Sequence, residues 1–483
     1  MRIFAPLRRR TGHWLGQCLA VSLLACSATG QAQQTESLGD LRAGIVTTPE
    51  EQAMGREFIA AARQQLKFIE DPLLTEYLES LGRGLAASLE GDTESLRFFL
   101  IDNPMINAFA GPGSRLAVFT GLIRATRSEA ELASVMAHEL GHVAQRHLPR
   151  MMERARQRKL PTTAGILAAI LLGGQAGAAA MAATSGAAMA DQLSYNREFE
   201  READVLGLNI LAAADYPTAA MIRFLKRLDQ ESRLQSAGAP EYLRTHPLTE
   251  NRIALVEGRV RLYPDLEERS SLDFHHARSR IRALYGEGGV ESISSDFFHE
   301  QKTDDEVVSR AARYGLILTL NRFGSYDEAL KQAEVLAEEF PDEFVYRLVI
   351  AETYLQSGRG AEAVSVLRGL AEQRPDATVI SYYLADALMK SRQLDEARKV
   401  VRAAIRSAPR EAPLYRLLAR VEGEKNNAAQ SFQALAEYHY INDEIAQALT
   451  QLNNALNASG GSAYLEASIN ARIKELEALR GKG

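Results

Sequence analysis

The spacing of apolar residues divides the chain into two helical regions with different patterns. From about residue 48 to residue 260 the pattern is largely helical with one short strand region, and from about residue 304 it is helical and repetitive. The clearest helix is predicted over residues 128–147, where Ser128 and Glu131 form a capping box. Its apolar stripe consists of Leu132, Val135, Met136 and Val143. These patterns predict a mainly α chain. Two or more domains are expected, because 483 residues are too many for one compact core.

A period of 34 residues runs through the second region. Small residues and prolines recur at this spacing, at Ala329, Ala363 and Ala397, at Pro341, Pro375 and Pro409, and at Gly324 and Gly358. Each unit is predicted to be two helices that meet closely at the alanine, with the proline ending the second helix. The pattern resembles the tetratricopeptide repeat, with three units over residues 309–411 and a degenerate fourth that contains residues 446–449. Such a solenoid offers a binding surface, and an ordinary helical bundle is the alternative.

The first 32 residues are interpreted as a secretory signal. Four arginines precede an uncharged apolar run over residues 14–25, and small residues suit cleavage after Ala32. The mature chain then begins near Gln33. One alternative is a lipoprotein acylated at Cys26. A membrane anchor is the other, but the run is shorter than the roughly 20 residues that a spanning helix needs.

Cleavage of this signal changes the charge and the cysteine content. Removing four arginines from the 56 basic residues leaves 52 against 62 acidic ones, a net charge of about −10. Nucleic-acid binding is therefore disfavoured. The only cysteines, Cys18 and Cys26, are lost with the signal, so no disulfide stabilises the mature protein.

A metal site is predicted on the helix over residues 128–147. His138 and His142 lie four residues apart, so both imidazoles project from one face and can bind one zinc ion. Glu139 lies beside them, where it can take a proton from a water molecule that the zinc activates. Gly141 is costly inside a helix and is explained if another helix approaches closely there. The alternative is a helix with two surface histidines.

The third ligand is sought downstream. A further histidine of the same motif is excluded, because Gln145 and Leu148 replace the glycine and the histidine it needs. His147 lies about 140° round the helix from His142 and is expected to face elsewhere. Glu200 is the predicted carboxylate ligand, and Asp204 on the same helix face is expected to accept an N–H from a ligating histidine or to donate a proton. A solvent-facing charged helix is the alternative.

These motifs resemble the M48 metallopeptidases. The resemblance covers residues 48–260 and includes further short segments, namely Asn107-Ala108-Phe109, Thr120-Gly121-Leu122, Ser194-Tyr195, His246-Pro247 and Arg252. It implies a mainly α protein: a zincin-type α+β metallopeptidase domain with a small sheet, followed by an all-α solenoid of tetratricopeptide repeats. The expected boundaries are residues 1–32 for the signal, 33–265 for the peptidase, 266–303 for a connector and 304–483 for the repeats.

With the signal and the repeats, the resemblance implies a periplasmic endopeptidase with one Zn²⁺ per chain. It further implies promotion of outer-membrane β-barrel folding, degradation of stalled barrels, and binding of the barrel-assembly machinery through the repeats. Two other classes are weighed: a non-catalytic chaperone or scaffold with a vestigial zinc domain, which intact Glu139 opposes, and an integral-membrane M48 protease facing the cytoplasm.

Three segments are expected to control access to the site. Residues 115–120 are predicted as an edge strand that can pair with a substrate chain, with an ordinary sheet strand as the alternative. Residues 162–190 carry no charge and are expected to form a lid or a peripheral membrane contact, with a core helix or a membrane span as alternatives. His246 precedes a proline and can stabilise the oxyanion or occupy the open metal position, unless it is structural.

Overall fold

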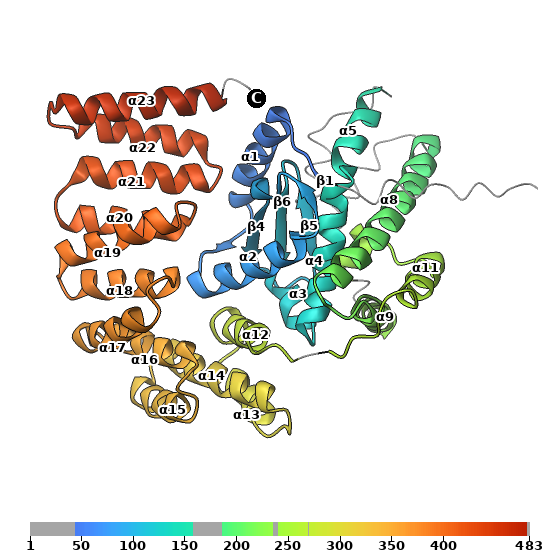
Figure 1. The fold of residues 1–483 in the computed structure, drawn as a ribbon, viewed down its shortest axis with the longest axis horizontal. Coiled ribbons are helices and arrows are strands. Elements are labelled where there is room, and N and C mark those ends of the chain that lie inside the picture. The colour runs from blue at the N-terminus through green and yellow to red at the C-terminus, as the bar shows by residue number, and fades with distance from the viewer. Residues whose placement is uncertain (1–43, 158–185, 235–239, 269, 481–483) are drawn as a thin grey trace, which may run out of the picture. The chain divides into compact units, whose positions relative to one another are not determined.

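The computed structural model describes residues 44–157, 186–234, 240–268 and 270–480 (Figure 1). The predicted signal at residues 1–32 and most of the uncharged segment 162–190 lie outside the described residues. The last five residues of that segment begin the helix α8, Gly186–Ala213. No helix in the described ranges has the length and apolar character that crossing a bilayer requires.

A small mixed sheet stands at the centre of the amino-terminal part, which precedes the repeats. Its strands follow the order β2–β4–β6–β5, with β4 and β6 parallel and both outer pairs antiparallel. The strands are β2 (Phe68–Ile69), β4 (Arg97–Ile101), β5 (Ala108–Gly111) and β6 (Arg115–Phe119), and a separate pair joins β1 (Gly44–Ile45) to β3 (Glu90–Gly91). Two helices, α1 (Pro49–Arg63) and α2 (Pro72–Ala86), and the short 3-10 helix η1 (Thr93–Ser95) complete this region.

The prediction that residues 115–120 form an edge strand is wrong. Strand β6 lies between β4 and β5, and all five of its residues are buried. A strand that is covered on both faces does not alternate between apolar and polar residues. This segment shows no such alternation. The edge next to β6 is β5, and β5 contacts the helix that carries the histidine motif.

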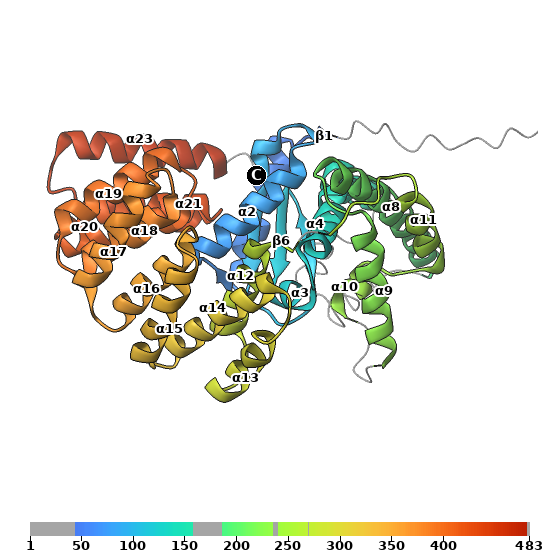
Figure 2. The same cartoon turned by 60° about the horizontal axis from the view of Figure 1, so that its bottom comes forward.

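That helix is α4, Glu129–Ala144, and it ends earlier than predicted. Arg146 has a φ of 53°, so the chain leaves the helical path before α5, His147–Gln157, begins. The predicted capping box is half formed: Ser128 accepts the Glu131 N–H, whereas the Glu131 carboxylate accepts from the Arg127 N–H. Figures 1 and 2 show α4 packed beside α8, and the other covering helices are α3 (Thr120–Ala125), α9 (Ala219–Leu234), α10 (Glu241–Thr245) and α11 (Glu250–Val260).

Two helices occupy the segment between the amino-terminal part and the repeats. They are α12 (Leu272–Tyr285) and α13 (Val290–Glu300), and both pack on the first repeat helix. Arg280 of α12 is buried and pairs with Asp71, which caps α2, and with Glu352 of the solenoid, at 2.7 Å and 2.6 Å. One guanidinium therefore connects the amino-terminal part to the repeats.

The repeats form a stack of helix pairs. Ala329, Ala363 and Ala397 are fully buried, as expected for the point where two helices meet. The turn within each helix pair contains a residue with a positive φ. These residues recur every 34 positions, at Gly324, Gly358, Arg392 and Asn426. The fourth unit therefore lies at α20–α21, before residues 446–449, and α22–α23 follows it. The helices are α14 (Glu306–Arg322), α15 (Tyr326–Glu339), α16 (Phe344–Gln356), α17 (Gly360–Gln373), α18 (Thr378–Lys390), α19 (Leu394–Ser407), α20 (Ala412–Glu424), α21 (Ala428–Ile441), α22 (Ile445–Asn457) and α23 (Ala463–Arg480).

Candidate metal centre

Two glycines allow α4 and α8 to approach closely. A Cβ atom added to Gly141 would lie 2.9 Å from the Ala203 carbonyl oxygen, and one added to Gly207 would lie 3.2 Å from the His138 backbone nitrogen. The explanation given for Gly141 from the sequence, close approach of a second helix, is therefore confirmed. Because the two backbones nearly touch, a carboxylate on α8 reaches the imidazoles on α4.

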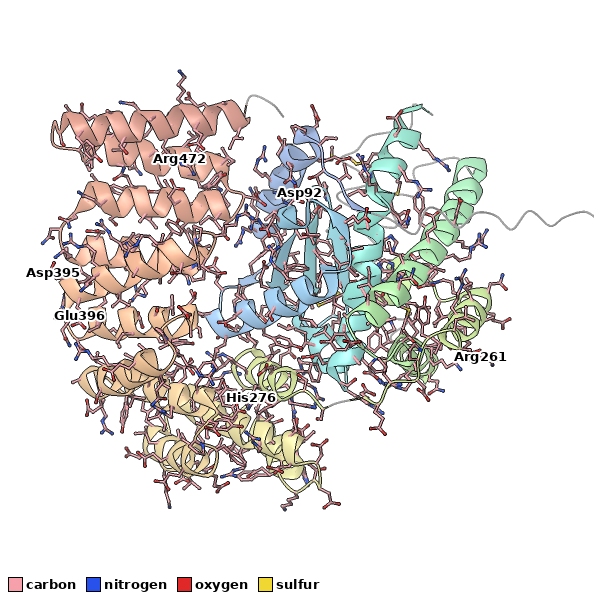
Figure 3. The ribbon with its side chains drawn as sticks, viewed as in Figure 1. Asp92, Arg261, His276, Asp395, Glu396 and Arg472 are labelled. Carbon is pink, nitrogen blue, oxygen red and sulfur yellow. The ribbon has the colours of Figure 1, made fainter. Side chains whose placement is uncertain are left out.

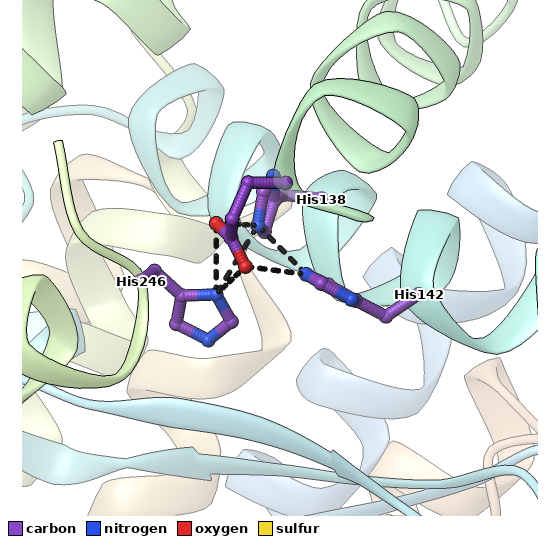
Figure 4. Close-up of side chains that lie close together, drawn as sticks. His138, His142 and His246 are labelled. Carbon is purple, nitrogen blue, oxygen red and sulfur yellow. Dashed lines mark hydrogen bonds and ion pairs between the residues drawn. The ribbon is translucent and has the colours of Figure 1, made fainter. Parts of the chain in front are cut away.

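The donor atoms of four side chains meet in this contact (Figure 4). His138 Nε2 lies 3.0 Å from His142 Nε2, and the Glu200 carboxylate oxygens lie 3.3 Å and 3.4 Å from these two nitrogens. His246, at the end of α10, brings its Nδ1 to 3.0 Å from Glu200 Oε1 and 3.4 Å from His138 Nε2. One ligand atom from each of the four residues lies within 4.8 Å of the others.

These distances fit a tetrahedral metal ion. Four ligands at zinc bond lengths of about 2.0–2.1 Å place neighbouring donor atoms about 3.3 Å apart. Two imidazoles and one carboxylate form a known donor set for catalytic zinc, which keeps a fourth position open. The four side chains drawn in Figure 4 can therefore hold a metal ion, with His246 directed at the fourth position.

The electrostatics of the site favour a cation. Burial opposes a charge on His138, but hydrogen bonds to Asp204 and Glu200 outweigh it and raise the pKa of His138 to about 10. Burial lowers the pKa of His142 to about 3. Glu200 is also buried, yet His246 and Arg252 hold the pKa of its carboxyl well below the usual range. Glu200 is thus ionised and His142 neutral, as metal binding requires, while a metal ion would displace the proton of His138.

Asp204 lies behind the histidines and not at the reacting centre. Its Oδ1 is 3.0 Å from His138 Nδ1, and Arg252 binds both carboxylate oxygens at 2.8 Å. Although burial opposes ionisation, Arg252 and His138 keep the pKa of Asp204 below its ordinary value. This geometry fixes the His138 tautomer, so that Nε2 is free to face the metal.

Glu139 is buried beside the donor atoms. Burial raises the pKa of its carboxyl, while a hydrogen bond from the backbone N–H of Ala110 in β5 opposes that rise. His246 Nε2 lies 3.3 Å from Glu139 Oε1. Glu139 therefore lies between the sheet edge and the donor atoms, where a carboxylate can accept a proton from a water molecule.

The expectation that His147 faces away is wrong. Its Nδ1 lies 2.8 Å from Nδ1 of His142, and its Nε2 lies 2.9 Å from Glu202. Arg150 also binds Glu202, at 2.7 Å, so a chain of polar contacts orients His142 from behind. Sequence reasoning missed this because the angle of about 140° assumes an unbroken helix, and the helix breaks at Arg146.

Two histidines four residues apart, an intervening glutamate and a carboxylate from a second helix define a metallopeptidase. The pattern of peptidase family M48 matches residues 72–260, and the tetratricopeptide repeat pattern matches residues 320–381 and 354–421. The chain is 31% identical to the beta-barrel assembly-enhancing protease of Escherichia coli (strain K12), over 99% of this chain and 98% of that protein. The chain therefore belongs to peptidase family M48, and it is a metalloendopeptidase.

Other relatives agree with this family. The beta-barrel assembly-enhancing protease of Yersinia pestis is 31% identical over 92% of this chain and 91% of its own length. The mitochondrial metalloendopeptidase OMA1 of Arabidopsis thaliana is 30% identical over 37% of this chain and 34% of its own length. The first similarity includes the repeats, whereas the second covers only part of the chain.

Proposed function

We propose that the chain is an exported zinc endopeptidase, with one zinc ion held by His138, His142 and Glu200. The observation that carries this proposal is the tetrahedral spacing of 3.0–3.4 Å among their donor atoms. Zinc supplies Lewis-acid chemistry and lowers the pKa of the water it binds to about 7. Asp204 orients His138, and Glu139 accepts the proton of the attacking water and passes it to the leaving amine.

The edge strand β5 is the proposed binding strand for substrate. A peptide that pairs with residues 108–111 is oriented by main-chain hydrogen bonds, which demand no particular sequence. Because the Ala110 N–H also reaches Glu139, the same strand aligns the substrate and the base. Such binding suits an enzyme that cuts unfolded chains of varied sequence.

In the cell, the proposed role is quality control of outer-membrane β-barrel proteins in the periplasm. Relatives named beta-barrel assembly-enhancing proteases match this chain over nearly its full length, repeats included. The enzyme would cut misfolded or stalled barrels and act as a chaperone for others, while the repeats would bind the barrel-assembly machinery. A secretory signal at residues 1–32 would deliver it.

The test is the variant Glu139→Gln in the mature protein. It should bind one zinc per chain, as the wild type does, and lose at least about 100-fold in cleavage of an unfolded outer-membrane barrel, because the base is gone. Glu153→Gln on α5 is a matched control outside the metal site and should cleave normally. An active Glu139→Gln protein would overturn the mechanism, and a wild type that binds zinc without cleaving would favour a non-catalytic chaperone.

A further inference from the structure

A second cavity lies between the sheet and the solenoid, lined by residues other than the metal-binding ones. Its volume is about 500 Å³, within the range of ligand sites, and its walls come from β2, β4, α2 and the solenoid residues 408–413 and 441–442. The apolar part of the lining includes aromatic rings and prolines, namely Phe68, Phe98, Phe99, Pro409 and Pro413. The cavity can therefore hold a bulky apolar group.

Two buried N–H donors of this lining have no acceptor, and one guanidinium has no ion pair. Asn442 is 5% exposed, and its Nδ2 has no hydrogen-bond partner, although its Oδ1 accepts from Arg63 at 2.6 Å. Arg63 Nε is likewise buried and unbonded. In the described part of the chain the Arg97 guanidinium has no ion pair, and burial and nearby Arg410 lower its pKa. Unbonded buried donors are costly, so the site lacks an acceptor such as an anion.

The acids of the lining do not supply that acceptor. Glu79 pairs with Arg83 at 2.6 Å, and Glu70 pairs with Arg416 at 2.5 Å. Glu94 lies 3.6 Å from Arg410. Burial and Glu79 raise the pKa of Glu411, while Arg97 lowers it. Among the described arginines of the lining, Arg97 is therefore the one without an ion pair.

Strand β4 also leaves part of one edge uncovered beside this cavity. Its partner β2 pairs with it only at Leu100 and Ile101. On the other side, the Arg97 N–H donates to the Ser114 carbonyl at 3.0 Å. Because the main-chain groups of successive strand residues face opposite sides, those of Phe98 face the uncovered edge. An extended peptide can pair there.

We propose that this cavity binds the carboxyl-terminal segment of a polypeptide that ends in a bulky apolar residue. The terminal carboxylate accepts hydrogen bonds from Arg97 and Asn442, and the last side chain lies beside the paired rings of Phe68 and Phe99. The preceding backbone pairs with Phe98. A free fatty acid has a similar charge and an apolar tail, but it cannot use the strand edge. The site thus holds a polypeptide by its end, apart from the metal.

Fluorescence anisotropy with a labelled short peptide ending in Phe tests the proposal. The full chain carries Glu139→Gln, so that the peptide is not cut and the outcome does not depend on catalysis. The free acid should bind at least about tenfold more tightly than the same peptide with a terminal amide, because a charge-assisted hydrogen bond is lost. An amidated peptide with an internal Glu should bind as weakly as the plain amide.

The variant Arg97→Gln should remove most of the preference for the free acid. Arg261→Gln, at the end of α11 (Figure 3), is the matched control and should keep it. Equal binding of acid and amide by the parent protein overturns the proposal, even if Arg97→Gln fails to fold. A folded Arg97→Gln protein that keeps the full preference for the free acid also overturns the proposal. So does an amidated peptide with an internal Glu that binds as tightly as the free acid.

Discussion

Arg252 binds Asp204 through two parallel hydrogen bonds, from Nε to Oδ2 and from Nη2 to Oδ1, each 2.8 Å long and buried. Its Nη1 lies 2.7 Å from Glu200 Oε2. One guanidinium thus neutralises both the proposed ligand carboxylate and the carboxylate that orients His138. The sequence pointed to Arg252 only through the family resemblance, since 48 residues separate it from Asp204.

Replacing Arg252 by Met should remove the buried guanidinium that pairs with two carboxylates, Asp204 and Glu200. Breaking one side of a buried ion pair costs about 3–5 kcal/mol, and a loss of that size is expected in denaturant unfolding. Zinc affinity should also fall, because His138 and Glu200 lose their orientation. Arg261→Met, an exposed change just beyond the same helix, should alter neither quantity. A stable Arg252→Met protein with full zinc content would contradict this role.

The sequence predicted that His138 and His142 project from one helix face, because four residues make about one helical turn. This relation depends only on local structure. Two other predictions failed because they depended on distant features. His147 was misplaced because a left-handed residue, Arg146, interrupts the helix. Strand β6 was taken for an edge because its neighbour β5 precedes it and pairs through a register that the local sequence does not encode.

The Gly141 contact predicts that Gly141→Ala weakens metal binding. The new methyl group would lie 2.9 Å from the Ala203 carbonyl oxygen, so α8 must move away from α4 and take Glu200 with it. Overpacking of this kind costs about 1–3 kcal/mol, more than the helix propensity gained from alanine. Zinc titration and denaturant unfolding measure both effects.

Gly258→Ala is the matched control, because Gly258 lies within α11 and no atom comes within 4 Å of its added Cβ. It should be neutral or slightly stabilising. If Gly141→Ala binds zinc as tightly as Gly258→Ala does, the close approach of α4 and α8 is not what positions the ligand.

The junction between the peptidase part and the repeats could not be predicted from local patterns, because its partners lie far apart in sequence. Arg115 pairs with Asp443 at 2.9 Å across 328 residues. His276 of α12 (Figure 3) lies at the same junction, where its Nε2 meets the Tyr346 hydroxyl at 3.0 Å. The sequence offered no pattern for His276, since its partner is supplied by the fold.

His276 should make stability depend on pH. Burial and the nearby Arg310 lower its pKa from 6.5 to about 3, so it is neutral in the folded protein. Below pH 6.5 the unfolded chain binds a proton that the folded one does not, and stability falls by about 1.4 kcal/mol per pH unit until about pH 3. The stability advantage of wild type over His276→Gln should therefore shrink by about 2 kcal/mol between pH 6.5 and 5.

Denaturant unfolding of the metal-free proteins at several pH values measures this difference, since titrations shared by both proteins cancel. His299→Gln, an exposed change on α13, is the control for replacing a histidine away from this contact. A constant difference between wild type and His276→Gln would mean that the imidazole is not held neutral at the junction.

His246 brings its Nδ1 among the donor atoms of His138 and Glu200, at the position that a catalytic zinc keeps for water. This placement favours the role of a reversible plug over that of an oxyanion donor. His246→Ala should therefore retain one zinc per chain and raise cleavage of an unfolded substrate several-fold, whereas His299→Ala should leave both quantities unchanged. Lower kcat with zinc retained would instead assign His246 to transition-state stabilisation. Unchanged turnover with unchanged zinc would reject both roles and leave His246 a structural residue of the α10 end.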